Sequence, residues 1–252
     1  MTTNCQNCNA ALQGKYCSNC GQSSETHKID IHYLSHDIQH GLLHFDKGIL
    51  FTTKELFTRP GNSIREFLEG KRIKHSKPIS LVLVLAGIYG LLFHFSKINM
   101  FANYVVISGS DEKVIQLNAV IENMSDWIVQ HYAIFALLQI PIFTIGTNLV
   151  FRKAGYNFVE HLVINTFLVG QRLILHIITF PLYYIYNGTS MLTTIDRILN
   201  LIAYALPFWA LIQLFRNQRK RILRTIFSLL ISFLLIFLIL IGCIVYAYTS
   251  IK

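Results

Sequence analysis

Residues 226–248 read IFSLLISFLLIFLILIGCIVYAY, a run of 23 residues without a charged side chain. A helix rises about 1.5 Å per residue, so this run can cross a hydrocarbon core about 30 Å thick. Four earlier apolar runs are of similar length: Ile79–Phe95, Tyr132–Phe151, Leu162–Tyr186 and Ile198–Phe215. The sequence therefore predicts an all-α polytopic membrane protein with five transmembrane helices. The first is expected to begin at Pro78, because proline suits the first turn of a helix.

The composition divides the chain into three parts. Of its 252 residues, 53% are hydrophobic and 14% are charged, whereas a soluble domain has about 25% charged residues. Polar and basic residues are concentrated before the first apolar run. We expect a small metal-binding ribbon over residues 1–25 and a cytoplasmic amphipathic and basic segment over 26–77. The membrane domain follows over 78–252, with an outer loop at 96–131.

The distribution of lysine and arginine predicts the orientation of the chain. From Lys54 onward, segments on the side of the N-terminus carry 14 of these residues, and segments on the other side carry four. Cytoplasmic loops are enriched in Lys and Arg, so the N-terminus is predicted to be cytoplasmic and the C-terminus extracytoplasmic. The polar start of the chain has no signal-peptide pattern, which agrees with this orientation. Much of the net charge of +9 is then a topology signal, which weakens the alternative that the chain binds RNA or a ribosome.

Four cysteines lie close to the N-terminus, as Cys5-x2-Cys8 and Cys17-x2-Cys20. Two such pairs can bring four thiolates together around one tetrahedral Zn²⁺. Four cysteines fill the coordination shell, so the zinc is predicted to be structural rather than catalytic. The alternative is two disulfides, which a reducing cytoplasm disfavours. The fifth cysteine, Cys243, lies in the last apolar run, where we expect a lone buried thiol.

Residues 30–49 have the pattern of an amphipathic helix with one apolar face. The opposite face carries a histidine at every fourth position: His32, His36, His40 and His44. Histidines with this spacing can bind a second metal ion or respond to pH near 6.5. The evidence against a metal site is that only Asp37 offers a nearby carboxylate and that no HExxH pattern is formed. The alternative is therefore a polar face that happens to use histidine.

Two short helices are expected between this segment and the membrane, separated by Pro60-Gly61. Two capping-box patterns predict where they begin: Thr52 with Glu55, and Ser63 with Glu66. The second helix is expected to stop at Gly70. A basic collar follows, formed by Lys71, Arg72, Lys74 and Lys77. The collar can bind anionic lipid headgroups at about 1 kcal/mol per basic residue, and the alternative is that it only orients the first transmembrane helix.

Arg172 lies near the middle of the third apolar run, next to Gln171 and four residues before His176. A charge at this depth costs about 2.5–3.5 kcal/mol or more, so it marks a paired or functional site. Structural pairing could use Asp126 or Asp196 at the outer edge, toward which a long guanidinium can extend. The alternatives are an anionic ligand or lipid bound by Gln171, Arg172 and His176, and proton chemistry through His176.

The outer loop contains apolar residues at helical spacing between Val114 and Ile128. This pattern predicts an amphipathic helix that lies on the outer surface of the membrane.

The region around the two short helices resembles an uncharacterised family of inner-membrane proteins, found mainly in Bacteroidota. The resemblance rests on Phe45–Gly48, on Thr53–Gly61, which ends in Arg-Pro-Gly, on Ile64–Arg72, which ends in Gly-Lys-Arg, and on Glu160-His161. Members of that family are similar in carrying a short zinc ribbon, an RPG…GKR segment and several transmembrane helices. The resemblance implies a multi-pass protein of the bacterial inner membrane with a bound zinc. It implies no activity, because the family is a domain of unknown function.

The sequence favours a non-catalytic protein, because no HExxH, serine elbow, paired carboxylates or phosphate loop occurs in a suitable context. The most specific motifs lie on the predicted cytoplasmic side. We therefore interpret the chain as an accessory or scaffold protein whose zinc ribbon and basic face dock a cytoplasmic protein, membrane complex or ribonucleoprotein. Membrane-protein biogenesis or secretion would suit such a role. The alternative is a small transporter or lipid-binding protein that uses Arg172 and His176.

Overall fold

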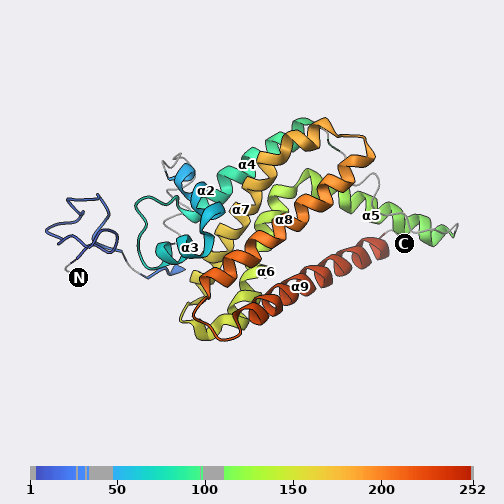
Figure 1. Cartoon of the computed structure of the whole chain (residues 1–252). Helices are drawn as coiled ribbons and strands as arrows, with labels where there is room; N and C mark the ends of the chain where they lie inside the picture. Colours follow the sequence, from blue (N-terminus) through green and yellow to red (C-terminus); the bar gives the residue numbers. More distant parts are fainter. Residues whose placement is uncertain are drawn as a thin grey trace.

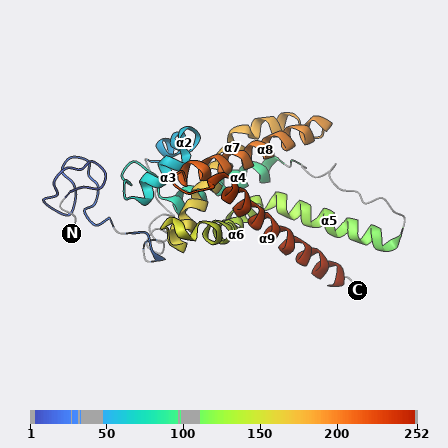
Figure 2. The ribbon, with the colours of Figure 1, turned by 60° about the horizontal axis from the view of Figure 1, so that its bottom comes forward.

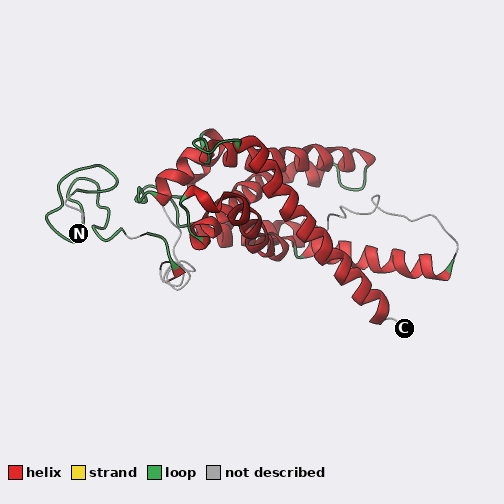
Figure 3. Cartoon of the chain, turned by 90° about the horizontal axis from the view of Figure 1, so that it is seen from below, coloured by secondary structure: helices red, strands yellow, loops and turns green. Residues whose placement is uncertain are grey.

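A computed structural model describes residues 4–26, 28–31, 33, 48–96, 98 and 111–250. Within these residues the regular structure is helical, apart from two isolated β-bridges near the N-terminus (Figure 3). The helices are α2 (Ile49–Thr58), α3 (Pro60–Leu68), α4 (Pro78–Ser96), α5 (Glu112–Gln130), α6 (Tyr132–Phe151), the 3-10 helix η1 (Arg152–Ala154), α7 (Phe158–Ile185), α8 (Ser190–Leu214) and α9 (Arg221–Ser250). The predicted all-α class is confirmed.

Five helices are long and apolar enough to cross a membrane: α4, α6, α7, α8 and α9. This confirms the five predicted transmembrane helices, and α4 begins at Pro78 as expected. The last three begin earlier than predicted, at Phe158, Ser190 and Arg221. Apolar runs mark the part of a helix that lipid can cover, whereas backbone hydrogen bonding continues into the polar residues at each end.

Successive transmembrane helices run in opposite directions (Figure 1). The N-terminal part, α2, α3 and the connections α6–α7 and α8–α9 therefore lie at one end of the bundle. The α7–α8 connection and the C-terminus lie at the other end. We call the first the basic end, because its two connections carry exposed basic side chains: Arg152, Lys153, Arg216, Arg219 and Lys220.

Helix α7 is the centre of the bundle. Helices α4, α6 and α8 pack against it along the membrane domain, and α2 and α3 reach it from the basic end. In its most apolar 18 residues, 72% are buried, against 11% in α9. The largest core side chains therefore gather around α7, with Phe67 of α3 edge-on to Phe167 at a centroid distance of 5.1 Å.

Helix α9 is held against α6 by small residues. Ser228 and Ser232 are fully buried, and a Cβ atom at Gly146 of α6 would lie 2.2 Å from Ser232 Oγ. Small residues let two membrane helices approach closely enough to gain van der Waals contact. The other faces of α9 are exposed and apolar, as lipid contact requires. Cys243 is exposed there, so the expectation of a buried thiol is wrong, because protein covers only one side of this helix.

The corner between α2 and α3 is fixed by Arg59. Its guanidinium forms a bidentate pair with Glu66, with Nη1–Oε1 at 2.8 Å and Nη2–Oε2 at 3.1 Å, and its Nε contacts the carboxylate of Glu55. Pro60 occupies the first position of α3. Two short helices are present as expected, but they are separated at Arg59 rather than at Pro60-Gly61, because these two residues begin α3. Bidentate pairing of Arg59 sets the geometry of the turn.

Helix α3 rests directly on the end of α8. A Cβ atom at Gly61 would lie 2.3 Å from the backbone nitrogen of Leu214 and 2.4 Å from the carbonyl oxygen of Ala210. Arg65 Nη2 donates to the carbonyl of Gln213 at 2.8 Å and also to that of Leu214. The last carbonyls of a helix have no helical partner and favour a cation, so Arg65 caps α8.

The two expected capping boxes are wrong. Helix α2 begins at Ile49, so Thr52 lies inside it, where its hydroxyl accepts a hydrogen bond from the Ser76 backbone at 2.8 Å. Ser63 is likewise buried inside α3. Residues three apart are neighbours on the surface of any helix, so Ser/Thr-x-x-Glu also occurs in helix interiors. The pattern alone therefore does not identify the first turn.

The amphipathic helix predicted in the outer loop is present as α5. Its residues Met124, Trp127 and Ile128 line an apolar groove together with α6 and α9. Figure 2 shows α5 and the C-terminal half of α9 extending away from α2 and α3. Its position on the surface of a membrane stays a prediction.

Replacing Gly61 by alanine is predicted to weaken the packing of α3 on α8. Overpacking a tight contact costs about 1–3 kcal/mol. Gly87 of α4 is the matched control, because a Cβ atom there meets nothing within 4 Å. We expect the melting temperature of the purified protein in detergent to fall for Gly61→Ala. It should hold or rise for Gly87→Ala, since alanine favours helix by about 1 kcal/mol. Equal melting temperatures for the two variants would contradict the contact.

Candidate metal centre and its docking surface

Two turns with the same backbone pattern hold the clustered cysteines. In the first, the Cys5 amide donates to the Ala10 carbonyl and the Asn9 amide donates to the Cys5 carbonyl, both at 2.8 Å. The second turn repeats both bonds 12 residues later at the same distances. The equivalent residues Asn9 and Gly21 have φ of 61° and 76°, a conformation that Asn and Gly adopt most easily. We call residues 4–23 the cysteine knuckle.

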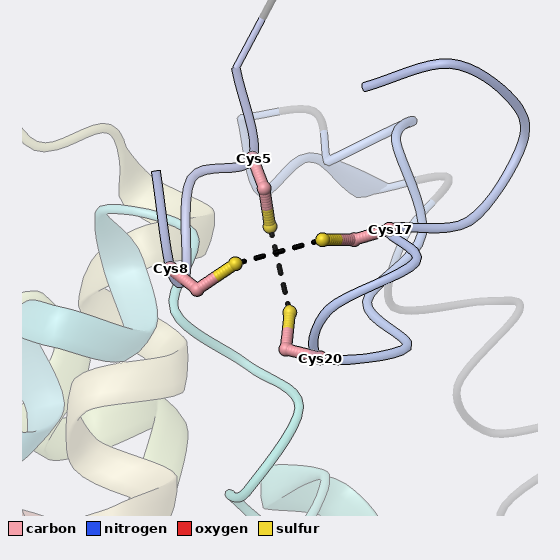
Figure 4. A group of neighbouring side chains, drawn as sticks. All are labelled: Cys5, Cys8, Cys17 and Cys20. Carbon is pink, nitrogen blue, oxygen red and sulfur yellow. Dashed lines mark hydrogen bonds between the residues drawn. The ribbon is translucent and has the colours of Figure 1, made fainter. Parts of the chain in front are cut away.

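The four sulfur atoms form a compact cluster (Figure 4). Cys5 Sγ lies 3.6 Å from Cys20 Sγ, Cys8 Sγ lies 3.5 Å from Cys17 Sγ, and all four lie within 4.8 Å of one another. A tetrahedron with metal–sulfur bonds of about 2.3 Å has edges of about 3.8 Å. All four thiols are free, so the disulfide alternative is not supported. The cluster is compatible with one tetrahedral metal ion.

The backbone around the sulfurs favours thiolates. At Cys17, backbone bonds at Cys20 and Asn19 lower the pKa of the thiol, but desolvation and the neighbouring thiols outweigh them and raise it to about 11. At Cys8, the Ala10 amide donates to the sulfur, and this bond is the largest cause of a thiol pKa lowered to about 6. Metal ions bind the thiolate form, so the turn prepares this ligand for a cation.

The cysteine knuckle contacts the rest of the chain through Gln22. This side chain is 4% exposed, its Nε2 donates to the Gly70 carbonyl at 2.9 Å, and its Oε1 accepts from the Arg72 amide at 3.0 Å. The Ile73 amide lies 3.3 Å from the same oxygen. The amide of Gln22 therefore pairs with the loop after α3 as a peptide group would. The sequence does not reveal that Gln22 makes this contact, because the residue lies two positions after the second CxxC pair and belongs to no recognisable motif.

Gly70 is required at this contact for two reasons. Its φ is +100°, a region that side chains rarely adopt. A Cβ atom there would also lie 1.9 Å from Gln6 Oε1 of the cysteine knuckle. The expected end of α3 near this glycine is confirmed, and the same residue makes room for the knuckle.

The segment after the knuckle is fixed to the start of α7. Ile29 is fully buried, and its carbonyl accepts from Asn157 Nδ2 at 2.9 Å. Asn157 and Glu160 form a capping box, and Lys28 Nζ lies 3.8 Å from Glu160 Oε2. The knuckle is therefore connected both to the loop after α3 and to the central helix.

The basic collar is partly interior. The Arg72 guanidinium lies over the rings of Tyr33 and Phe67, at 5.0 Å and 5.4 Å, and Nε donates to the Phe67 carbonyl at 3.1 Å. Burial lowers the pKa of Arg72. The other three collar residues are half-buried or exposed: Lys71, Lys74 and Lys77. Lipid binding by the collar stays a prediction. These three lysines are better placed for it than Arg72, whose guanidinium contacts two aromatic rings.

His75, inside the collar, is a core residue that the sequence did not single out. It is buried edge-on to Phe51 at 5.1 Å and to Phe67 at 5.9 Å. Burial lowers the pKa of His75 to about 4, so the imidazole is neutral near pH 7.

The structure separates the intramembrane residues that the sequence grouped. Gln171 turns to α2, where its Nε2 donates to the Leu56 carbonyl at 2.5 Å. Arg172 lies on a different face of α7 and donates from Nη1 to Gln139 Oε1 of α6 at 2.7 Å. Consecutive helical residues point about 100° apart, which explains the separation.

Arg172 is not paired with an acid. Its Cζ lies 4.6 Å from the centre of the Tyr204 ring of α8, and no carboxylate lies within 4.0 Å among the described residues. The expectation of Asp126 or Asp196 as its partner is therefore corrected to Gln139 and Tyr204. His176 is buried among aromatic rings and contributes no hydrogen bond to Arg172 in the described part. The four histidines of the predicted second site, His32, His36, His40 and His44, lie outside the described residues.

Residues 46–90 match the family described as "Protein of unknown function (DUF3667)". The matched stretch holds α2, α3, the basic collar and most of α4, including the residues that receive the knuckle. No curated protein and no solved structure matches the chain. The family match assigns no activity, and the membrane-like character of the chain comes from its five long apolar helices.

The cysteine cluster is predicted to bind one metal ion per chain. Replacing Cys17 by serine removes a buried ligand, so metal content measured by elemental analysis should fall from about one equivalent to near zero. Cys243→Ser is the matched control, because this thiol lies on the exposed face of α9. Full metal content in Cys17→Ser, or loss of metal in Cys243→Ser, would contradict the assignment.

Proposed function

We propose that the chain is a non-catalytic accessory protein of a bacterial inner membrane that docks a cytoplasmic partner through its cysteine knuckle and basic end. The observation that carries this proposal is the Gln22 contact with Gly70 and Arg72. It joins the knuckle to helices that are themselves packed on the membrane bundle. A module fixed in this way presents a defined surface.

Zinc is the metal that best fits the cluster. Four thiolates in a tetrahedral arrangement are typical of structural zinc sites, and they leave no open position for a substrate. The knuckle has few apolar residues to bury, so the metal would supply the stability that a core gives to a larger domain.

The charge distribution supports a cytoplasmic position for the knuckle. The connections at the basic end lie beside α2 and α3, and positive residues favour the cytoplasmic side. The C-terminus would then be extracytoplasmic. In this orientation Lys71 and Lys74 can reach anionic lipid headgroups near the inner surface.

The partner is expected to carry a negatively charged surface. Exposed basic side chains occur on the knuckle at Lys15, beside it at Lys71 and Lys74, and on both connections of the basic end. We favour a protein or membrane complex, such as one involved in membrane-protein biogenesis or secretion. The alternative partner is a ribonucleoprotein, which ribonuclease treatment of the purified complex would distinguish from a protein partner.

A transporter that uses Arg172 and His176 is less well supported. The cavity beside Arg172 has a volume of about 20 Å³, which is too small for an organic solute.

Co-purification in mild detergent from cells that express the full chain tests the docking proposal. Gln22→Ala keeps all four cysteines but leaves the Arg72 amide without its partner, at a cost of about 1–3 kcal/mol. We expect a partner protein to co-purify with the wild-type chain and with the Cys243→Ser variant. Recovery should fall at least severalfold with Gln22→Ala and further with Cys17→Ser.

Ribonuclease treatment shows whether the captured partner depends on RNA. A wild-type chain that purifies alone would overturn the proposal. So would a Cys17→Ser chain that recovers the same partner in the same amount.

A further inference from the structure

One face of α7 carries a line of polar residues through the bundle. His161, Asn165, Arg172, His176 and Tyr183 fall within about 60° of arc at 100° per residue. Each is buried, with exposures between 0% and 6%. Polar and ionisable residues in the interior of a membrane protein are costly and mark functional positions.

Side chains of α6 and α8 meet this line at successive levels. The hydrogen bonds are Asn165 Nδ2 to Thr147 Oγ1 at 2.9 Å, Arg172 Nη1 to Gln139 Oε1 at 2.7 Å, and the Tyr183 hydroxyl to Asp196 Oδ1 at 3.2 Å. We call this set the polar ladder. It places hydrogen-bonding groups from near the basic end to the opposite end of the bundle.

Arg172 is the charge in the ladder that lacks compensation. Its side chain is 6% exposed, and no described carboxylate lies within ion-pair distance. Asp196 accepts hydrogen bonds from Tyr183 and Asn200. Gln139, Tyr204 and the neighbouring Tyr132 are neutral, and the Nε atom of Arg172 is buried without a hydrogen-bond partner. A buried cation is stable when an opposite charge or a full set of acceptors surrounds it.

A cavity lies beside this guanidinium. It has a volume of about 20 Å³ and is lined by Arg172, Asn165 and Tyr204, with apolar walls that include Phe143 of α6 and Leu229 of α9. A single water needs about 10–15 Å³ of such volume, so the cavity can hold one small particle. A phosphate headgroup or an organic carboxylate is too large for it.

We propose that this cavity binds one small monovalent anion, with chloride as the probe, which balances the charge of Arg172. The unpartnered Nε–H supplies a charge-assisted donor, and the apolar walls strengthen the attraction by excluding water. The exposed basic residues at one end of the bundle raise the local concentration of anions. The site is separate from the cysteine knuckle and does not depend on the docking proposal.

A thermal unfolding titration of the full chain, purified in a neutral detergent, tests the site. Chloride replaces gluconate stepwise at constant ionic strength. A ligand that binds the folded state raises its stability, so we expect a saturable increase of about 2–4 °C in melting temperature. Arg172→Gln should abolish the increase. Arg197→Gln is the control, because that arginine is exposed on α8.

Leu229→Phe keeps the test decisive if Arg172→Gln does not fold. The larger ring fills the cavity from α9 while Arg172 remains, so the chloride response should disappear. Equal melting temperatures of the wild type in chloride and gluconate would show that the cavity holds only water, and would overturn the proposal. A chloride response that persists in Leu229→Phe would place the anion elsewhere and would overturn it as well.

Discussion

The contact between the Gln22 side chain and the backbone at Gly70 and Arg72 determines how the N-terminal part is arranged. A cysteine knuckle of about 20 residues has too little apolar surface to dock by burial alone. A side-chain amide that donates and accepts at the same loop gives it a defined position instead. That loop follows α3, α3 rests on α8 through Gly61 and Arg65, and α8 packs on α7. The position of the knuckle is therefore set by the transmembrane bundle.

The segment that matches the family of unknown function is the structural link in this chain of contacts. It contains Gly61, where two helix backbones meet, and Gly70, where the knuckle approaches. A side chain at Gly61 would displace the backbone of α8, whereas one at Gly70 would be strained by the positive φ and would move the Gln6 side chain. The RPG and GKR motifs are thus explained by packing between α2, α3, the knuckle and α8, without reference to a reaction.

The transmembrane helices and the cysteine cluster could be predicted from sequence, because one physical constraint determines each of them. The thickness of a bilayer sets the length of the five apolar runs, and the geometry of a tetrathiolate site sets the CxxC spacing. Contacts between distant segments could not be predicted in this way. Thr52 matches a capping pattern but lies inside α2 and bonds to the Ser76 amide. Arg172 was expected to be able to reach Asp126 or Asp196 but contacts Gln139 and Tyr204. Such pairings depend on helix rotation and crossing, which periodicity alone does not determine.

Hydrogen exchange at the Arg72 and Ile73 amides tests the central contact most directly, because both amides donate to Gln22 Oε1. The metal-loaded wild-type chain should be compared with metal-loaded Gln22→Ala. The account predicts slow exchange at these two amides in the wild type and markedly faster exchange in the variant. The Ser63 amide, bonded to the Arg59 carbonyl at the start of α3, should exchange equally in both. Equal exchange at Arg72 and Ile73 in the two proteins would contradict the account.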